Sequence, residues 1–152
     1  SFARDLLISF ADSGFARVLI LTGHAGGLHM AALEEACHMA VEERDFHVSL
    51  VSLFDLIDAK AVETPHDGHA GEMETSLMMA IRSDLVKGKP AEHFPKRPQF
   101  LIMKDVRHLM GNGIMGNPHP ATLEKGTQFF QMAVTGVMGA LDELESDAWK
   151  KK

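Results

Sequence analysis

Residues 17–21 (RVLIL) and the stretch that follows them, residues 22–29 (TGHAGGLH), decide the fold class of this 152-residue chain. The first stretch is short, almost wholly apolar and rich in branched side chains, which is typical of a buried strand in a parallel sheet. The second is a glycine-rich turn that opens an amphipathic helix predicted over residues 28–44. The order strand, glycine turn, helix predicts an α/β fold.

The neighbouring segments extend this order to helix, strand, helix, strand. Residues 2–11 repeat apolar side chains at helical spacing, and residues 46–54 alternate before they become apolar, as a second strand does. A right-handed crossover between two such strands predicts a parallel sheet covered by helices. Further along the chain, we expect a helix over residues 72–85, a strand at residues 100–103 (FLIM) and a closing helix over residues 121–144.

Composition and charge narrow the class of protein. A hydrophobic content of 45% suits one globular domain over residues 1–152. The net charge of -6 argues against nucleic acid and against an anionic membrane surface as partners. No apolar run approaches the ~20 residues that span a bilayer. The single cysteine, Cys37, and a beginning without the pattern of a signal peptide predict a reducing cytoplasm.

The first glycine turn places His24 at the carboxyl end of the first predicted strand. Open α/β sheets bind ligands at this edge, and histidine is the commonest metal ligand, so His24 is a candidate ligand. The alternative to a ligand role is a tight turn in which the histidine is only a solvent-exposed polar residue. GHAGG fits neither GxGxxG nor the phosphate loop, so nucleotide binding is disfavoured. His29, one turn into the helix, is more often a surface or packed residue than a second ligand.

Residues 67–76 (DGHAGEMETS) gather titratable groups where a helix is about to begin. The helix dipole favours carboxylates in this first turn by roughly 0.3–1 kcal/mol each, which readily explains one acid. Glu72 and Glu74 lie about 200° apart around a helix, so at most one can point at a given centre and the other is a cap or a supporting partner. We expect Asp67 to orient a histidine. With His69, the motif favours metal-assisted or acid–base chemistry.

Three motifs resemble those of the creatininase family of metal-dependent amidohydrolases in their order and spacing. They are residues 22–27 (TGHAGG), 69–76 (HAGEMETS) and 113–126 (GIMGNPHPATLEKG). The resemblance runs from the first helix to about Glu145. It implies a three-layer αβα sandwich with a mainly parallel sheet, a dinuclear zinc, manganese or iron centre, and a hexamer. Family members hydrolyse non-peptide or cyclic C–N bonds in small molecules.

Carried over by position, the resemblance also implies roles for single residues. His24 and Glu74 match metal ligands of the family. His69 matches the histidine that moves a proton to the leaving nitrogen, and Glu72 matches an acid that only some members have. The implied function is metal-dependent hydrolysis of a small amide, formamide or cyclic amide.

The chain also departs from the family pattern. Creatininase proper has a glutamate ligand at the place of Gly26 and tryptophans near the second motif, whereas the only tryptophan here is Trp149. Asn117 stands where aspartate is common. The family's opening segment, which supplies three more ligands, has no counterpart except the dipeptide Glu92-His93, a poor substitute. The differences at Gly26 and in the tryptophans disfavour creatinine as the substrate. They leave an alternative, an inert or split subunit that acts as a structural partner.

Overall fold

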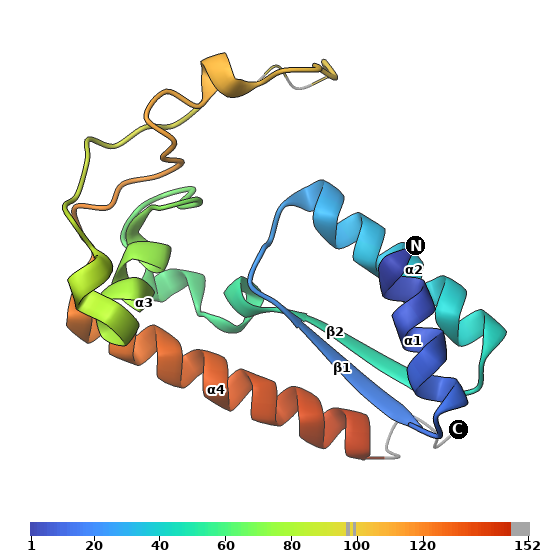
Figure 1. The fold of residues 1–152 in the computed structure, drawn as a ribbon. Helices are drawn as coiled ribbons and strands as arrows, with labels where there is room; N and C mark the ends of the chain where they lie inside the picture. The colour runs from blue at the N-terminus through green and yellow to red at the C-terminus, as the bar shows by residue number, and fades with distance from the viewer. Residues whose placement is uncertain (97, 99, 147–152) are drawn as a thin grey trace. The chain divides into compact units, whose positions relative to one another are not determined.

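The computed structural model describes residues 1–96, 98 and 100–146, which form two compact units (Figure 1). The first unit contains residues 1–57 and the residues from 133 onward. The second contains residues 58–132. The single domain that we expect over residues 1–152 stays a prediction. Trp149 lies outside the described residues.

The first unit is built on a parallel pair of strands, β1 (Arg17–Thr22) and β2 (His47–Ser52). Arg17 pairs with His47, and Thr22 pairs with Ser52, so the carboxyl ends of both strands meet at one edge. Helix α1 (Phe2–Asp12) precedes β1, and helix α2 (Gly27–Glu43) connects the two strands (Figure 1). The order helix, strand, helix, strand and the parallel pairing are therefore confirmed.

A small apolar core holds these elements together. Leu7 of α1, Ala40 of α2 and Phe46 before β2 are buried against one another, and Val18 and Ile20 of β1 pack on them. Burying one large apolar side chain contributes about 1.5–3 kcal/mol, so Leu7 and Phe46 are the main anchors of this cluster. This core covers Val18 and Ile20 of β1, whereas Leu21 at the end of the apolar run is 49% exposed.

The second unit carries helix α3 (Glu72–Arg82), which is followed by a 3-10 turn at Ser83–Leu85. Helix α4 (Leu123–Glu145) begins in this unit, and its residues from Ala133 belong to the first. Residues 111–120 carry only turns, bends and an isolated bridge. No described helix combines the length and the apolar character that crossing a bilayer requires.

The strand predicted at residues 100–103 is wrong. These residues carry no strand, and the side chains of Phe100 and Ile102 are 90% and 99% exposed. An apolar run becomes a strand only where a neighbouring strand accepts its backbone hydrogen bonds. Among the described residues, the pairing in this part of the chain is an isolated antiparallel bridge between His93 and Gly116.

Candidate functional site

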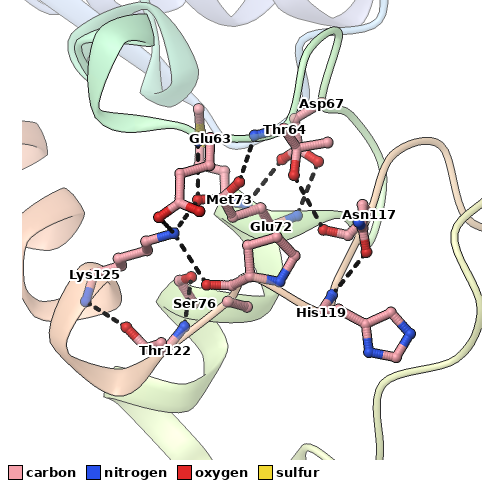
Figure 2. Close-up of polar contacts among 12 residues, drawn as sticks. Glu63, Thr64, Asp67, Glu72, Met73, Ser76, Asn117, His119, Thr122 and Lys125 are labelled. Carbon is pink, nitrogen blue, oxygen red and sulfur yellow. Dashed lines mark hydrogen bonds and ion pairs between the residues drawn. The ribbon is translucent and has the colours of Figure 1, made fainter.

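Asp67 organises the loop that precedes α3. Its Oδ1 accepts a hydrogen bond of 2.8 Å from the backbone N–H of Glu72, and its Oδ2 accepts one of 2.8 Å from Met73 (Figure 2). These N–H groups lie in the first turn of α3, where no helical carbonyl can accept from them. Gly71, at the N-cap, has no side chain to do so. The expectation that Asp67 orients a histidine is therefore wrong, because its carboxylate caps the helix.

Two glycines make room for this carboxylate. A Cβ at Gly71 would lie 1.9 Å from Asp67 Oδ1, and a Cβ at Gly116 would lie 2.3 Å from the same atom. The backbone N–H of Asn117 also donates to Asp67. Burial raises the pKa of Asp67 above its ordinary value, although the N–H groups of Met73, Glu72 and Asn117 act to lower it. The second and third sequence motifs are thus joined through one half-buried carboxylate.

Glu72 is fully buried and ties the preceding loop to α3. Its Oε2 accepts a hydrogen bond of 2.7 Å from the backbone N–H of Thr64, and its Oε1 accepts one of 3.1 Å from Glu63 (Figure 2). Lys125 Nζ lies 2.6 Å from Oε1. Burial raises the pKa of Glu72, but the hydrogen bonds from Lys125, Thr64 and Glu63 outweigh it and leave the pKa below its ordinary value. These are the contacts of a structural carboxylate, and a catalytic role for Glu72 stays a prediction.

Lys125, from the first turns of α4, completes this network. Besides Glu72, its ammonium lies 2.7 Å from Glu63 Oε1 and donates to the carbonyl of Pro120 at 3.0 Å. Its side chain is 18% exposed. Sequence reasoning did not identify Lys125. The signal that could have identified Lys125 is the need of a buried glutamate for a nearby cation. The segment LEKG of the third motif contains such a cation.

Glu74 and His69 form a second pair on the other side of α3. His69 Nδ1 lies 3.2 Å from Glu74 Oε2, and the same oxygen accepts a hydrogen bond of 2.8 Å from the backbone N–H of Ala70. Ala70 adopts a positive φ of 52°, an uncommon conformation outside glycine that turns its N–H toward the carboxylate. The backbone N–H of Met115 donates to the carbonyl of His69 at 2.8 Å. As the helical spacing predicts, Glu72 and Glu74 face different centres.

This pair has the chemistry of a proton carrier. A carboxylate oxygen beside Nδ1 favours the tautomer of His69 that has its proton on Nδ1, and this tautomer leaves Nε2 to exchange a proton with a bound molecule. The His69 side chain is 65% exposed, and the Glu74 side chain is 33% exposed. A molecule from solvent can therefore reach His69.

His69 and Glu74 line a cavity of about 590 Å³ within the second unit, together with Thr75, Met78 and Asn112. Cavities of this size hold small organic molecules. A larger one, of about 920 Å³, lies elsewhere in the same unit, and its lining includes neither His69 nor Glu74. The larger cavity is also lined by titratable groups, among them His66 and Glu92, but the smaller one holds the paired histidine and carboxylate of His69 and Glu74, so we take it as the candidate site.

His24 lies in the turn between β1 and α2, in the first unit. Its backbone N–H donates to Thr22 Oγ1 at 3.2 Å, and Nε2 of His29 lies 3.1 Å from the same hydroxyl. The two imidazole rings are neighbours, with centroids 5.1 Å apart. The structure thus brings His24 and His29 together. The sequence analysis treats His29 as a surface or packed residue. A turn that leads directly into a helix can bring residues five positions apart into contact, and this spacing was the signal for the pair.

The described residues do not supply a complete metal centre. No group of three or more His, Cys, Asp or Glu side chains among them is arranged to hold an ion. A zinc site needs three or four protein ligands, so the set that the resemblance implies is not formed by these residues. His24 belongs to the first unit and Glu74 to the second, and their binding of one cation stays a prediction.

Comparison with known proteins decides the family. The model of the creatininase family, described as creatinine amidohydrolase, matches residues 1–141. The chain belongs to the creatininase family. The resemblance that the three motifs carry is therefore confirmed.

Two relatives define how much of a family member this chain represents. The creatinine amidohydrolase of Pseudomonas putida is 27% identical over 161 aligned residues, which cover 92% of this chain and 60% of that protein. The solved structure of a mutant creatininase superposes with a TM-score of 0.80 at 22% identity and covers 95% of this chain and 63% of that one. The α/β fold of the creatininase family is confirmed. The chain spans about three fifths of the length of these relatives.

Proposed function

We propose that this chain belongs to an amidohydrolase that cleaves a C–N bond in a small amide, formamide or cyclic amide, with His69 as the proton donor. The observation that carries the proposal is the pairing of His69 Nδ1 with Glu74 Oε2 at 3.2 Å in a cavity of about 590 Å³. Family membership supports the reaction class, since both similar proteins are named for creatinine hydrolysis.

The chemistry of amide hydrolysis explains why this pair matters. Water adds its hydroxyl to the carbonyl carbon, and its remaining proton ends on the nitrogen whose bond to carbon breaks. An amine leaves slowly unless it is protonated as the bond breaks, so a positioned acid contributes about 10²–10⁴-fold to the rate. His69 offers Nε2 for this proton, and Glu74 Oε2, 3.2 Å from Nδ1, orients the ring.

We further propose that the enzyme requires a divalent metal, either zinc, manganese or iron, in a dinuclear centre. His24 and Glu74 are the candidate ligands in this chain. The described residues form no complete ligand set, so the steps derived above are those of His69 and Glu74 alone. A homohexamer in the cytoplasm, with no nucleic-acid or membrane partner, is part of the same proposal.

The test compares His69 with a histidine of the same unit that lies outside the cavity. The protein is purified without chelators and offered N-formyl amines, N-acetyl amines and five- and six-membered lactams, while release of formate, acid or amine is measured. We expect His69→Ala to lower turnover by about 10²-fold or more. His119→Ala, an exposed control, retains it. Equal turnover in wild type and His69→Ala would contradict the proposal.

The second candidate is an inert or split subunit that acts as a structural partner. The observation that favours it is the incomplete ligand set among the described residues. Elemental analysis of the same preparation separates the two functions. A metal-dependent enzyme retains zinc, manganese or iron, whereas a structural subunit contains none and hydrolyses none of the compounds above.

A further inference from the structure

The pairing of His69 with Glu74 depends on an uncommon conformation of the backbone between them. Glu74 Oε2 contacts both Nδ1 of His69, at 3.2 Å, and the backbone N–H of Ala70, at 2.8 Å. Ala70 has a φ of 52°, and His66, at the start of the same loop, has a φ of 54°. Residues other than glycine keep such conformations only where the surrounding contacts hold them. The pair therefore needs a support that fixes residues 67–71.

Asp67 closes this loop at its base. Its two carboxylate oxygens accept the backbone N–H groups of Glu72 and Met73, each at 2.8 Å (Figure 2). The chain from Asp67 to Glu72 is thereby closed into a ring, and both His69 and Ala70 lie within it. The contacts of one carboxylate thus limit how far the backbone of this segment can move.

A second set of contacts fixes the same ring from the third motif. The backbone N–H of Asn117 donates to Asp67, and that of Met115 donates to the carbonyl of His69 at 2.8 Å. Gly116 lies between these two donors, and a Cβ there would be 2.3 Å from Asp67 Oδ1. The ring is therefore held at two points, one at the carboxylate and one at the histidine.

A helix cap is the simpler explanation of Asp67, because an aspartate before a helix commonly accepts N–H groups of the first turn. Stabilisation of α3 accounts for the two bonds from the start of that helix. It does not account for the bond from Asn117, which lies outside the helix, or for the close fit against Gly116. Those contacts connect the carboxylate to the segment that binds His69.

We propose that Asp67 is a positioning residue of the hydrolase, which holds His69 and Glu74 in their pairing through the loop that it closes. The inference rests on the proposed function, in which His69 donates a proton. Among the described residues, the hydrogen bonds of Asp67 come from backbone N–H groups, and the lining of the 590 Å³ cavity does not include it. Asp67 acts through the backbone and does not touch the bound molecule.

Asp67→Asn tests this role with a side chain of the same shape. Its amide keeps one oxygen and places an NH₂ donor against the N–H group that the other oxygen accepted. The loop should open there, and the N–H of Ala70 should leave Glu74. For the full chain, purified without chelators, we expect kcat on the amide panel to fall by about 10–100-fold. KM should stay unchanged, because Asp67 does not contact the bound molecule.

Asp58→Asn is the matched control. Asp58 lies in the same unit and caps the 3-10 turn Ala59–Ala61, where its Oδ1 accepts the backbone N–H of Lys60 at 2.9 Å. It is therefore also an aspartate that binds a backbone N–H group, but the described lining of the candidate cavity does not include it. This variant should retain kcat. Each kcat is measured below the unfolding temperature of its variant, so that a loss of stability does not lower it.

Spectra of the ring nitrogens test the pairing without turnover. A carboxylate beside Nδ1 favours the tautomer of His69 with its proton on Nδ1, and ¹⁵N shifts report the tautomer. We expect Asp67→Asn to shift both ring nitrogens of His69 toward the tautomer mixture of a free imidazole, and Asp58→Asn to leave them unchanged. If Asp67→Asn fails to fold, Asp67→Ser, which keeps one acceptor oxygen, should give the same change.

Two results would overturn the positioning role. One is an unchanged kcat in the folded Asp67 variant, and the other is a set of His69 nitrogen shifts equal to those of the parent protein. If the parent protein hydrolyses no compound of the amide panel, the hydrolase proposal fails. The nitrogen shifts still decide in that case whether Asp67 holds the pair.

Discussion

Lys125 Nζ lies 2.6 Å from Glu72 Oε1, and the side chain of Glu72 is completely buried although the two residues are 53 positions apart in the chain. A carboxylate that is removed from water needs a compensating cation and hydrogen bonds. Here the loop residues Glu63 and Thr64 supply backbone N–H groups, and α4 supplies the cation. Loss of the lysine leaves a buried, uncompensated charge.

Lys125→Met should therefore destabilise the protein by about 3–5 kcal/mol. Urea denaturation followed by circular dichroism measures the loss. Lys60→Met, an exposed lysine of the same unit, serves as the control and should change stability by less than about 0.5 kcal/mol. The double variant Glu72→Gln/Lys125→Met should recover part of the loss because it contains no unpaired charge. Equal stabilities of Lys125→Met and Lys60→Met would show that the pair does not stabilise the fold.

Acidification should weaken the protein through Glu72. Its pKa in the folded state lies below the ordinary value of 4.5, because the hydrogen bonds from Lys125, Thr64 and Glu63 outweigh the effect of burial. The stabilisation is therefore complete above pH 4.5 and is lost as the pH falls through the folded pKa. Asp67, whose pKa burial raises, contributes in the opposite direction. Measured between pH 7 and 3, the free energy of unfolding should fall less steeply in Glu72→Gln than in wild type.

Two glycines of α4 should respond oppositely to alanine. A Cβ at Gly126 would lie 1.8 Å from the backbone carbonyl oxygen of Ser76, so Gly126→Ala must move α4 away from α3 and should cost about 3 kcal/mol. A Cβ at Gly139 would meet nothing within 4 Å. Gly139→Ala should stabilise the helix by up to about 1 kcal/mol. Thermal unfolding of both variants measures the two changes in stability. A destabilised Gly139→Ala would contradict the prediction for that position.

Metal content and turnover should separate the roles of the predicted site residues. His24→Ala should lower the amount of bound zinc, manganese or iron, because it removes a proposed ligand. His69→Ala should keep the metal and lose turnover, because its ring transfers a proton. Elemental analysis and the amide panel give the two readings on the same preparation. Full metal occupancy in His24→Ala would show that its assignment as a ligand is wrong.

The elements that the sequence predicts correctly are those with local causes. RVLIL became β1, because an apolar run followed by a glycine turn and an amphipathic segment specifies strand, turn and helix with neighbouring residues alone. The helical angle between Glu72 and Glu74 follows from the helix geometry in the same way. The strand predicted at residues 100–103 (FLIM) is wrong because a strand needs a neighbouring strand to pair with, and apolar composition alone does not provide one.

By itself, the sequence determined the order of these elements, the three motifs and the helix that separates Glu72 from Glu74. Only the tertiary structure decided what the acids do. Asp67 caps α3, Glu72 is neutralised by Lys125, and Glu74 turns to His69. For Glu72 the reason is that burial and charge pairing depend on which distant residues fold against a carboxylate, and a local pattern contains no information about a lysine 53 positions away. Asp67 and Glu74 contact groups five or six positions away, and the folded conformation of the loop decides which of these groups each one meets.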